Sequence, residues 1–221
     1  MSIILHHLNA SRSFRILWLL EEINQPYELK SYFRDKATNL APQELKNIHP
    51  LGKSPVIELS EKVIAESGAI VEILIEKFAP QLAPAKDSDS YLDYLQWIHF
   101  SESSAMVPYL LNIFNSIELK NGTQLKFLDQ YAYAELDKVF SYLDQQLAGK
   151  KFLVDNCLTG ADFMIGFVVY GLINSLNIRS KYLNIEQYVE SLKSLESWQR
   201  AMMIEQNLHQ QINEIDLGKE S

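Results

Sequence analysis

The first third of the chain alternates short apolar runs with longer amphipathic stretches. Four apolar runs have the length of β-strands: 3–8, 27–33, 56–59 and 62–65. Three stretches carry apolar residues at helical spacing: 12–24, 42–48 and 66–78. Ser60-Glu61 separates the last two runs as a hairpin turn does, and a helix between the first two runs predicts that they pair in parallel. The pattern therefore indicates an α/β domain over residues 1–78.

Beyond this domain the strand pattern stops and only helical patterns follow. Residues 79–86 contain two prolines, which resist helix formation, so we interpret them as a linker. Five helices are predicted after it: 87–115, 124–147, 160–176, 186–194 and 195–206. Pro108 is expected to bend or break the first helix, and Thr159 with Asp162 forms a capping box at the start of the third. Residues 87–221 are thus predicted to be all-helical, and the fold class is α/β plus all-α.

Composition narrows the class of protein. The chain has 221 residues and a formal net charge of −8, which disfavours nucleic acids and anionic membranes as partners. Its single cysteine, Cys157, cannot form an intramolecular disulfide and fits a reducing compartment. The N-terminus lacks the pattern of a signal peptide, no apolar run is long enough to cross a bilayer, and no metal-ligand spacing occurs. We therefore expect a cytoplasmic protein with no metal site, no nucleic-acid partner and no membrane association.

Two helix starts and one proline offer candidate binding groups. Ser11 follows the first strand and Ser67 precedes an apolar helix, so each is a candidate N-cap at a helix terminus that favours an anion. Pro55 marks the edge of the third strand, whose free main-chain groups can pair with a short peptide. These features together predict a site for a small peptide-like ligand. His6 and His7, on the first strand, are interpreted as packing residues.

Four motifs resemble counterparts in the cytosolic glutathione S-transferases: SRSFRILWLLEE, HPLGKSPVIEL, AESGAIVEIL and FLVDNCLTGADFMIG. The resemblance covers residues 1 to about 206 and is most similar to the serine-type microbial branch of the family. It implies a thioredoxin-like, glutathione-binding N-terminal domain (1–78), a linker (79–86) and an all-helical C-terminal domain (87–221).

The resemblance also implies roles for individual residues. Ser11, four residues before Arg15, is the expected catalytic residue that holds the glutathione sulfur as a thiolate, and Ser13 and Asn9 remain alternatives for this contact. Five residues are expected to bind glutathione: Lys53, Ser54, Pro55 as a cis-proline, Glu66 and Ser67. Arg34 and Lys36 are alternatives to Lys53 for the glycine carboxylate. Three others are candidates for a second-substrate pocket: Met106, Tyr109 and Phe114. A thiol with a pKa of about 8.5 is mostly protonated at neutral pH, so a hydroxyl donor beside the sulfur would favour the thiolate.

The implied activity is a glutathione transferase that acts in detoxification as a cytoplasmic homodimer. Glutathione would be a co-substrate, with no permanently bound cofactor, and its thiolate would attack a small hydrophobic electrophile. Two alternatives remain: a glutathione-dependent peroxidase or disulfide reductase that uses the same site, and a non-catalytic interaction module with the same fold. The absence of a Cys near position 11 argues against chemistry in which a protein cysteine forms a mixed disulfide.

Overall fold

The computed structural model describes residues 2–36, 38–176 and 181–217, and the chain divides into two compact units. The first unit is Met1–Pro80 together with Lys193–Ser221, and the second is Gln81–Leu192. The sequence predicts that all of 87–221 belongs to the helical domain. Instead, the chain returns to the first unit at Lys193, because its last helix packs against the first helix of the chain.

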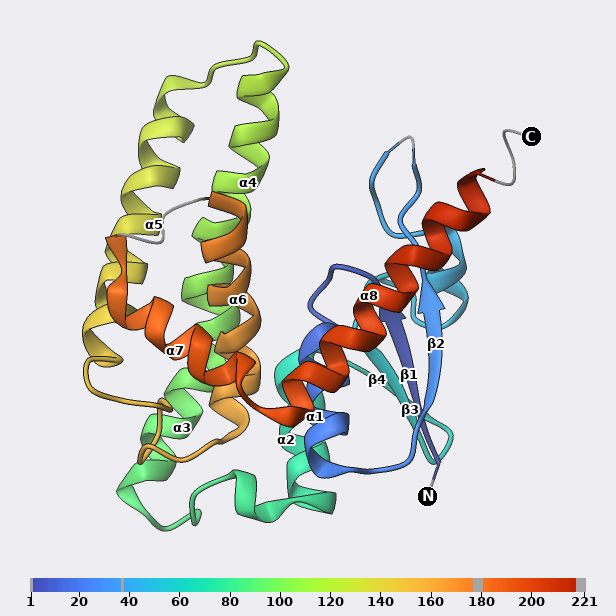
Figure 1. Cartoon of the computed structure of the whole chain (residues 1–221), viewed down its shortest axis with the longest axis vertical. Helices are drawn as coiled ribbons and strands as arrows, with labels where there is room; N and C mark the ends of the chain where they lie inside the picture. The colour runs from blue at the N-terminus through green and yellow to red at the C-terminus, as the bar shows by residue number, and fades with distance from the viewer. Residues whose placement is uncertain (1, 37, 177–180, 218–221) are drawn as a thin grey trace. The chain divides into compact units, whose positions relative to one another are not determined.

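A four-stranded sheet forms the centre of the first unit (Figure 1). The strands are β1 (Ile3–Leu8), β2 (Glu28–Tyr32), β3 (Val56–Leu59) and β4 (Lys62–Ala65), in the order β2-β1-β3-β4. β1 and β2 are parallel, as predicted, and the other pairs are antiparallel. Ser60 and Glu61, with φ angles of 48° and 69°, form the hairpin turn, because positive φ at both central residues matches the twist of the strands.

Three helices and one short 3-10 turn complete the first unit. They are α1 (Phe14–Ile23), η1 (Gln43–Asn47), α2 (Ser67–Phe78) and α8 (Glu196–Leu217). The ring of Trp198 on α8 meets Phe14 edge-on at 5.0 Å and Trp18 edge-on at 4.7 Å between centroids, and all three side chains are buried. Because aromatic rings bury large areas, this cluster holds α8 against α1. The predicted helix over 195–206 is therefore part of a longer helix that belongs to the sheet unit.

Both predicted serine N-caps are wrong. α1 begins at Phe14, so Ser13 and not Ser11 occupies the N-cap position, and its side chain makes no capping hydrogen bond. α2 begins at Ser67 itself, and Glu66 occupies the cap position with a φ of 71°. In both places the serine hydroxyl has other partners, which compete with the capping geometry.

The second unit is helical. Its elements are the short turn η2 (Pro80–Leu82, which joins the units), α3 (Asp89–Phe100), the π-helical turn η3 (Ser101–Ala105), α4 (Met106–Lys120), α5 (Lys126–Gln146), α6 (Gly160–Leu176) and α7 (Leu183–Lys193). The predicted helix 87–115 is thus interrupted at η3. Pro108 has no N–H and its ring crowds the carbonyl four residues earlier, at Ser104, which explains the widened turn there.

The carboxylate half of the predicted capping box at the start of α6 is confirmed, whereas the Asp162 N–H donates to the Thr159 carbonyl in place of the Thr159 hydroxyl. Asp162 Oδ2 accepts the Thr159 N–H at 2.8 Å and the Thr159 hydroxyl at 3.2 Å, while Asp162 Oδ1 accepts the Leu153 N–H at 3.0 Å and the Tyr188 hydroxyl at 2.8 Å. Asp162 is fully buried, and burial raises its pKa to about 6 against the opposing effect of these hydrogen bonds. Within the described part of the chain, none of the helices combines the length and apolar character needed to span a bilayer.

Candidate active site

The turn between β1 and α1 carries two serines with linked hydroxyls. Ser11 Oγ lies 2.9 Å from Ser13 Oγ and accepts the Ser13 N–H at 3.2 Å. Ser13 Oγ in turn accepts the Leu8 N–H at 3.2 Å, donates to the Leu8 carbonyl at 3.0 Å and lies 2.9 Å from His7 Nδ1. Ser13 is fully buried, whereas Ser11 keeps 8% of its surface exposed. The Ser13 hydroxyl is therefore enclosed by protein groups, and the Ser11 hydroxyl is the outer member of the pair.

His7 connects this pair of serines to α8. Its Nε2 lies 2.6 Å from Glu205 Oε2, and Glu205 Oε1 accepts the Ala10 N–H at 2.6 Å. His7 is fully buried and Glu205 is 9% exposed. We call these four side chains, Ser11, Ser13, His7 and Glu205, the serine–histidine chain. His7 is thus more than the packing residue that the sequence predicts, because both of its ring nitrogens are hydrogen-bonded.

Ser54 and Pro55 lie beside the same end of β1. The peptide bond between them is cis, which confirms the cis-proline that the resemblance implies. Ser54 Oγ donates to the His6 carbonyl at 2.8 Å and accepts the Leu8 N–H at 3.1 Å. The Leu8 N–H is therefore shared by Ser13 and Ser54, so the turn that carries Ser11 and the segment before β3 meet at one main-chain group. β3 pairs with its neighbours from Val56 onward, so the main chain of Ser54 lies just before the ladder.

The start of α2 is tied to α1 by a buried polar contact. Arg15 Nη1 donates to Ser67 Oγ at 3.0 Å, and both residues are buried. Glu66, the preceding residue, has an exposed side chain that makes no capping hydrogen bond. The predicted pair Glu66-Ser67 is therefore split: Ser67 faces the interior of the unit and Glu66 faces solvent.

Three further candidates lie on loops of the first unit. Lys53 is exposed in the loop before Ser54. Arg34 Nη2 donates to the Ala10 carbonyl at 3.2 Å, and burial lowers the pKa of its guanidinium. Asn9 is 6% exposed, and its Nδ2 is buried without a hydrogen-bond partner. Asn9 thus keeps a free donor near Ser11 in the sequence.

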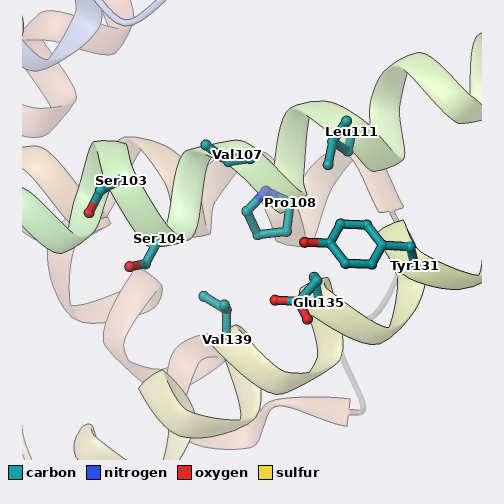
Figure 2. A pocket seen from close by; sticks show the side chains of 8 residues that line it. All are labelled: Ser103, Ser104, Val107, Pro108, Leu111, Tyr131, Glu135 and Val139. Carbon is teal, nitrogen blue, oxygen red and sulfur yellow. The ribbon is translucent and has the colours of Figure 1, made fainter. Parts of the chain in front are cut away.

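The predicted second-substrate residues differ in their exposure. Met106 and Tyr109 are buried in the core of the helical unit, where the Tyr109 hydroxyl lies 3.3 Å from Ser175 Oγ, while Phe114 is 57% exposed. Figure 2 shows one open pocket in this unit, with side chains from η3, α4 and α5 around it; its volume is about 240 Å³. Its lining residues are Ser103, Ser104, Val107, Pro108, Leu111, Tyr131, Glu135 and Val139. Met106 and Tyr109 are absent from it because they lie on the side of α4 that packs into the core.

Sequence reasoning missed His7 and Glu205. The two residues are 198 positions apart, and neither stands in a recognisable motif. A buried histidine on a strand carries no signal of its partner, since the partner comes from the packing of α8. Among residues 2–36, 38–176 and 181–217, no group of three or more His, Cys, Asp or Glu side chains is placed to hold a metal ion.

By its elements, the chain combines a thioredoxin-like sheet unit with an all-helical unit. Two family models match it: "Glutathione S-transferase, N-terminal domain" over residues 2–75 and "Glutathione S-transferase, C-terminal domain" over residues 112–199. The chain is 33% identical to Glutathione S-transferase 3 of Schizosaccharomyces pombe, over 85% of this chain and 81% of that protein. The chain therefore belongs to the glutathione S-transferase family.

Two more comparisons show what else the chain is similar to. A crystal structure of a glutathione S-transferase from Actinobacillus pleuropneumoniae is 36% identical, covers 90% of both chains and superposes with a TM-score of 0.80. Elongation factor 1-gamma 3 of Oryza sativa subsp. japonica is 28% identical over 85% of this chain but only 45% of that protein. The likeness thus extends to a longer protein, of which this chain matches about half.

Proposed function

We propose that this protein is a glutathione transferase in which Ser11 holds the glutathione sulfur as a thiolate. The observation that carries the proposal is a continuous set of hydrogen bonds at one end of β1. The Leu8 N–H joins Ser54 to Ser13, and Ser13 joins Ser11. The segments that the resemblance assigns to the sulfur and to the cysteinyl main chain are therefore held together by the fold.

Ser11 is favoured over Ser13 because of how their hydroxyls are used. A hydroxyl has one hydrogen to donate and two lone pairs to accept. Ser13 Oγ already lies within hydrogen-bond distance of the Leu8 N–H, the Leu8 carbonyl, His7 and Ser11, and it is fully buried. Ser11 is partly exposed and lies just before α1, whose N-terminus favours a negative charge. A thiolate beside Ser11 would gain both effects.

The hydrogen bond from Ser11 to the sulfur is strong enough to make much of the bound glutathione a thiolate at neutral pH. A charge-assisted hydrogen bond contributes about 1.5–3 kcal/mol, and each pKa unit corresponds to about 1.36 kcal/mol. One hydroxyl donor therefore lowers the pKa of the thiol by about one or two, from about 8.5 to near 7. The thiolate fraction at pH 7 rises from a few per cent to about half. Ser11 need not ionise, since it acts as a donor to the sulfur.

The remaining parts of glutathione would lie along Ser54 and the start of α2. The main chain of Ser54, just before the β3 ladder, suits pairing with the cysteinyl unit. Glu66 is exposed and negatively charged, so it complements the ammonium of the γ-glutamyl end, and the α2 N-terminus complements the neighbouring carboxylate. Lys53 is exposed and suits the glycine carboxylate.

The electrophile would be a small hydrophobic molecule, and the working form would be a cytoplasmic homodimer, as in the serine-type branch of the family. A panel of chloroaromatic, epoxide, hydroperoxide and disulfide substrates separates conjugation from reduction. The chain has no cysteine near position 11, which argues against a reaction through a protein mixed disulfide, so the panel decides between conjugation and reduction by the bound thiolate itself.

The test is a titration of glutathione into the wild type and Ser11→Ala, with the ultraviolet absorbance of the thiolate followed against pH. We expect the pKa of the bound thiol to be lowered in the wild type and to return toward the free value in Ser11→Ala, with binding retained. Ser88→Ala, which removes a hydroxyl at the start of α3, is the matched control. An unshifted thiol in the wild type would refute the thiolate mechanism.

The likeness to elongation factor 1-gamma favours one second candidate, a non-catalytic module. The same titration separates the two, because a non-catalytic module would bind no glutathione or bind it as an ordinary thiol. Asn9→Ala tests the other donor near Ser11, since the Asn9 amide has a hydrogen to offer. If Asn9→Ala and not Ser11→Ala raises the pKa of the bound thiol, the sulfur contact belongs to Asn9.

A further inference from the structure

We infer that the serine–histidine chain is a proton relay, which carries the proton of the glutathione thiol from Ser11 through Ser13 to His7, with Glu205 stabilising the charged imidazole. This inference rests on the proposed role of Ser11. It adds to that role a destination for the proton, which a serine hydroxyl alone cannot supply because it is too weak a base.

The carboxylate of Glu205 fixes the tautomer of His7. Glu205 Oε1 accepts the Ala10 N–H at 2.6 Å, and Oε2 lies 2.6 Å from His7 Nε2. Because an ionised carboxylate only accepts hydrogen bonds, the hydrogen of the neutral imidazole is on Nε2. His7 Nδ1 is then an acceptor, and it faces Ser13 Oγ at 2.9 Å. The histidine is thus oriented with its basic nitrogen toward the serines.

Each step of the relay lies within hydrogen-bond distance. Ser13 Oγ lies 2.9 Å from His7 Nδ1, and Ser11 Oγ lies 2.9 Å from Ser13 Oγ. In the relay the Ser13 hydroxyl rotates from the Leu8 carbonyl, to which it otherwise donates, to His7 Nδ1, and the Ser11 hydroxyl donates to Ser13 Oγ. When glutathione binds, the thiol proton passes to Ser11 Oγ, the Ser11 hydrogen passes to Ser13 Oγ, and the Ser13 hydrogen passes to His7 Nδ1. One S–H and two O–H bonds break, while two O–H bonds and one N–H bond form. The sulfur becomes a thiolate, the imidazole becomes an imidazolium, and no electron changes hands.

After the proton transfer, the polar atoms of the relay still have hydrogen-bond partners. Ser11 now carries the former thiol hydrogen on the side of the sulfur, so it donates to the thiolate as the proposed function requires. His7 Nδ1 has become a donor to Ser13, and the Leu8 carbonyl, 3.0 Å from Ser13 Oγ, offers that hydroxyl another acceptor. The imidazolium is paired with the Glu205 carboxylate, and a buried charge needs such a partner. Both protonation states of the chain therefore keep their polar atoms bonded.

The surroundings isolate the relay. His7 and Ser13 are fully buried, and Glu205 is the charged residue that contacts His7 within the described part of the chain. His6, the next residue, belongs to a separate network: its Nδ1 lies 2.8 Å from the Tyr32 hydroxyl and its Nε2 lies 2.8 Å from Glu58. The two histidines are equally buried and each is paired with a glutamate, but only the His7 network reaches Ser11. His7 and Glu205 are thus positioning residues that act through the serines.

Two substitutions break the relay at different points. Ser13→Ala removes the middle hydroxyl and leaves the pair of His7 and Glu205 intact. Glu205→Gln keeps an oxygen for the Ala10 N–H, but its NH₂ faces His7 Nε2 and forces the ring hydrogen onto Nδ1, which can then accept no proton. Glu58→Gln is the matched control, since it makes the same change beside His6.

The experiment combines two readouts on full-length protein with glutathione. The first is the thiolate absorbance against pH: both relay variants should raise the pKa of the bound thiol by about one, with glutathione affinity retained and Glu58→Gln unchanged. The rate of conjugation should fall about tenfold near pH 6.5 and recover above pH 9, whereas damage to the structure would lower it at every pH. The second is calorimetry in buffers of different ionisation enthalpy. The wild type should release nearly no proton per thiolate formed, and Ser13→Ala should release one.

The outcomes separate the relay from the proposed function. If Ser11→Ala raises the pKa of the bound thiol but Ser13→Ala and Glu205→Gln do not, the relay is overturned and the role of Ser11 stands. Release of one proton per thiolate by the wild type overturns the relay as well. If Ser11→Ala also leaves the thiol unchanged, both the relay and the proposed role of Ser11 fail.

Discussion

Replacing Asp162 with asparagine tests how burial and hydrogen bonding balance at the start of α6. The carboxylate accepts hydrogens on both oxygens: from Leu153 N–H and the Tyr188 hydroxyl on one, and from Thr159 on the other. An amide has only one accepting oxygen, so whichever way it is turned its NH₂ faces a buried main-chain N–H. That clash is independent of pH. The ionisation of the wild-type carboxyl, by contrast, adds a contribution to the free energy of unfolding that varies with pH.

The magnitude follows from the pKa of the carboxyl. Burial raises the pKa of Asp162 to about 6, while an unfolded aspartate titrates near 3.9. Between these values the folded state binds more protons than the unfolded state, so stability falls as pH rises. A difference of about two pKa units corresponds to about 3 kcal/mol. The stability of the wild type relative to Asp162→Asn should therefore be greatest below pH 4 and should decline by about 3 kcal/mol as pH rises past 6.

The assay is urea denaturation, followed by circular dichroism, of the wild type and Asp162→Asn between pH 3.5 and 8. The difference between the two proteins removes the titration of all other groups, because both proteins share them. Asp155→Asn is the matched control: it removes a charge from an exposed aspartate with a φ of 48°, which asparagine also tolerates. A difference that stays constant, or that grows as pH rises, would show that the hydrogen bonds outweigh burial and would refute the reasoning.

Other substitutions test contacts in each unit. Ser67→Ala removes one acceptor of the buried Arg15 guanidinium and should lower both stability, by about 1.5–3 kcal/mol in urea denaturation, and glutathione affinity. Glu66→Gln should lower only the affinity in a binding titration, since Glu66 is exposed; an equal loss of stability in both variants would contradict this. Gly171→Ala should cost about 1–3 kcal/mol, because the added Cβ would lie 2.9 Å from Tyr109 Cζ. The Tyr109 hydroxyl oxygen is the atom nearest that Cβ, so adding Tyr109→Phe should restore part of the lost stability. If it restores none, another contact causes the loss.

Local pattern predicted most of the elements. β1, β3, β4 and α6 begin and end at the predicted residues, because alternating or continuous apolar runs and turn residues report burial directly. The residues that cap the helix starts were harder to predict, since a serine hydroxyl has several competing partners. Ser13 and Ser67 bond to His7 and Arg15 in place of capping their helices, and the sequence contains no signal of that choice.

The sequence by itself determined the family, the strand and helix pattern, and the candidate residues around Ser11, Ser54 and Pro55, because all of these reside in short contiguous motifs. Only the tertiary structure decided which unit α8 joins and which of the serines is outermost. It also brought Glu205 to His7 across 198 positions. The physical reason is that packing and hydrogen bonding between distant segments depend on the folded backbone, so the pairing of a strand residue with a residue of the last helix leaves no local trace in the sequence.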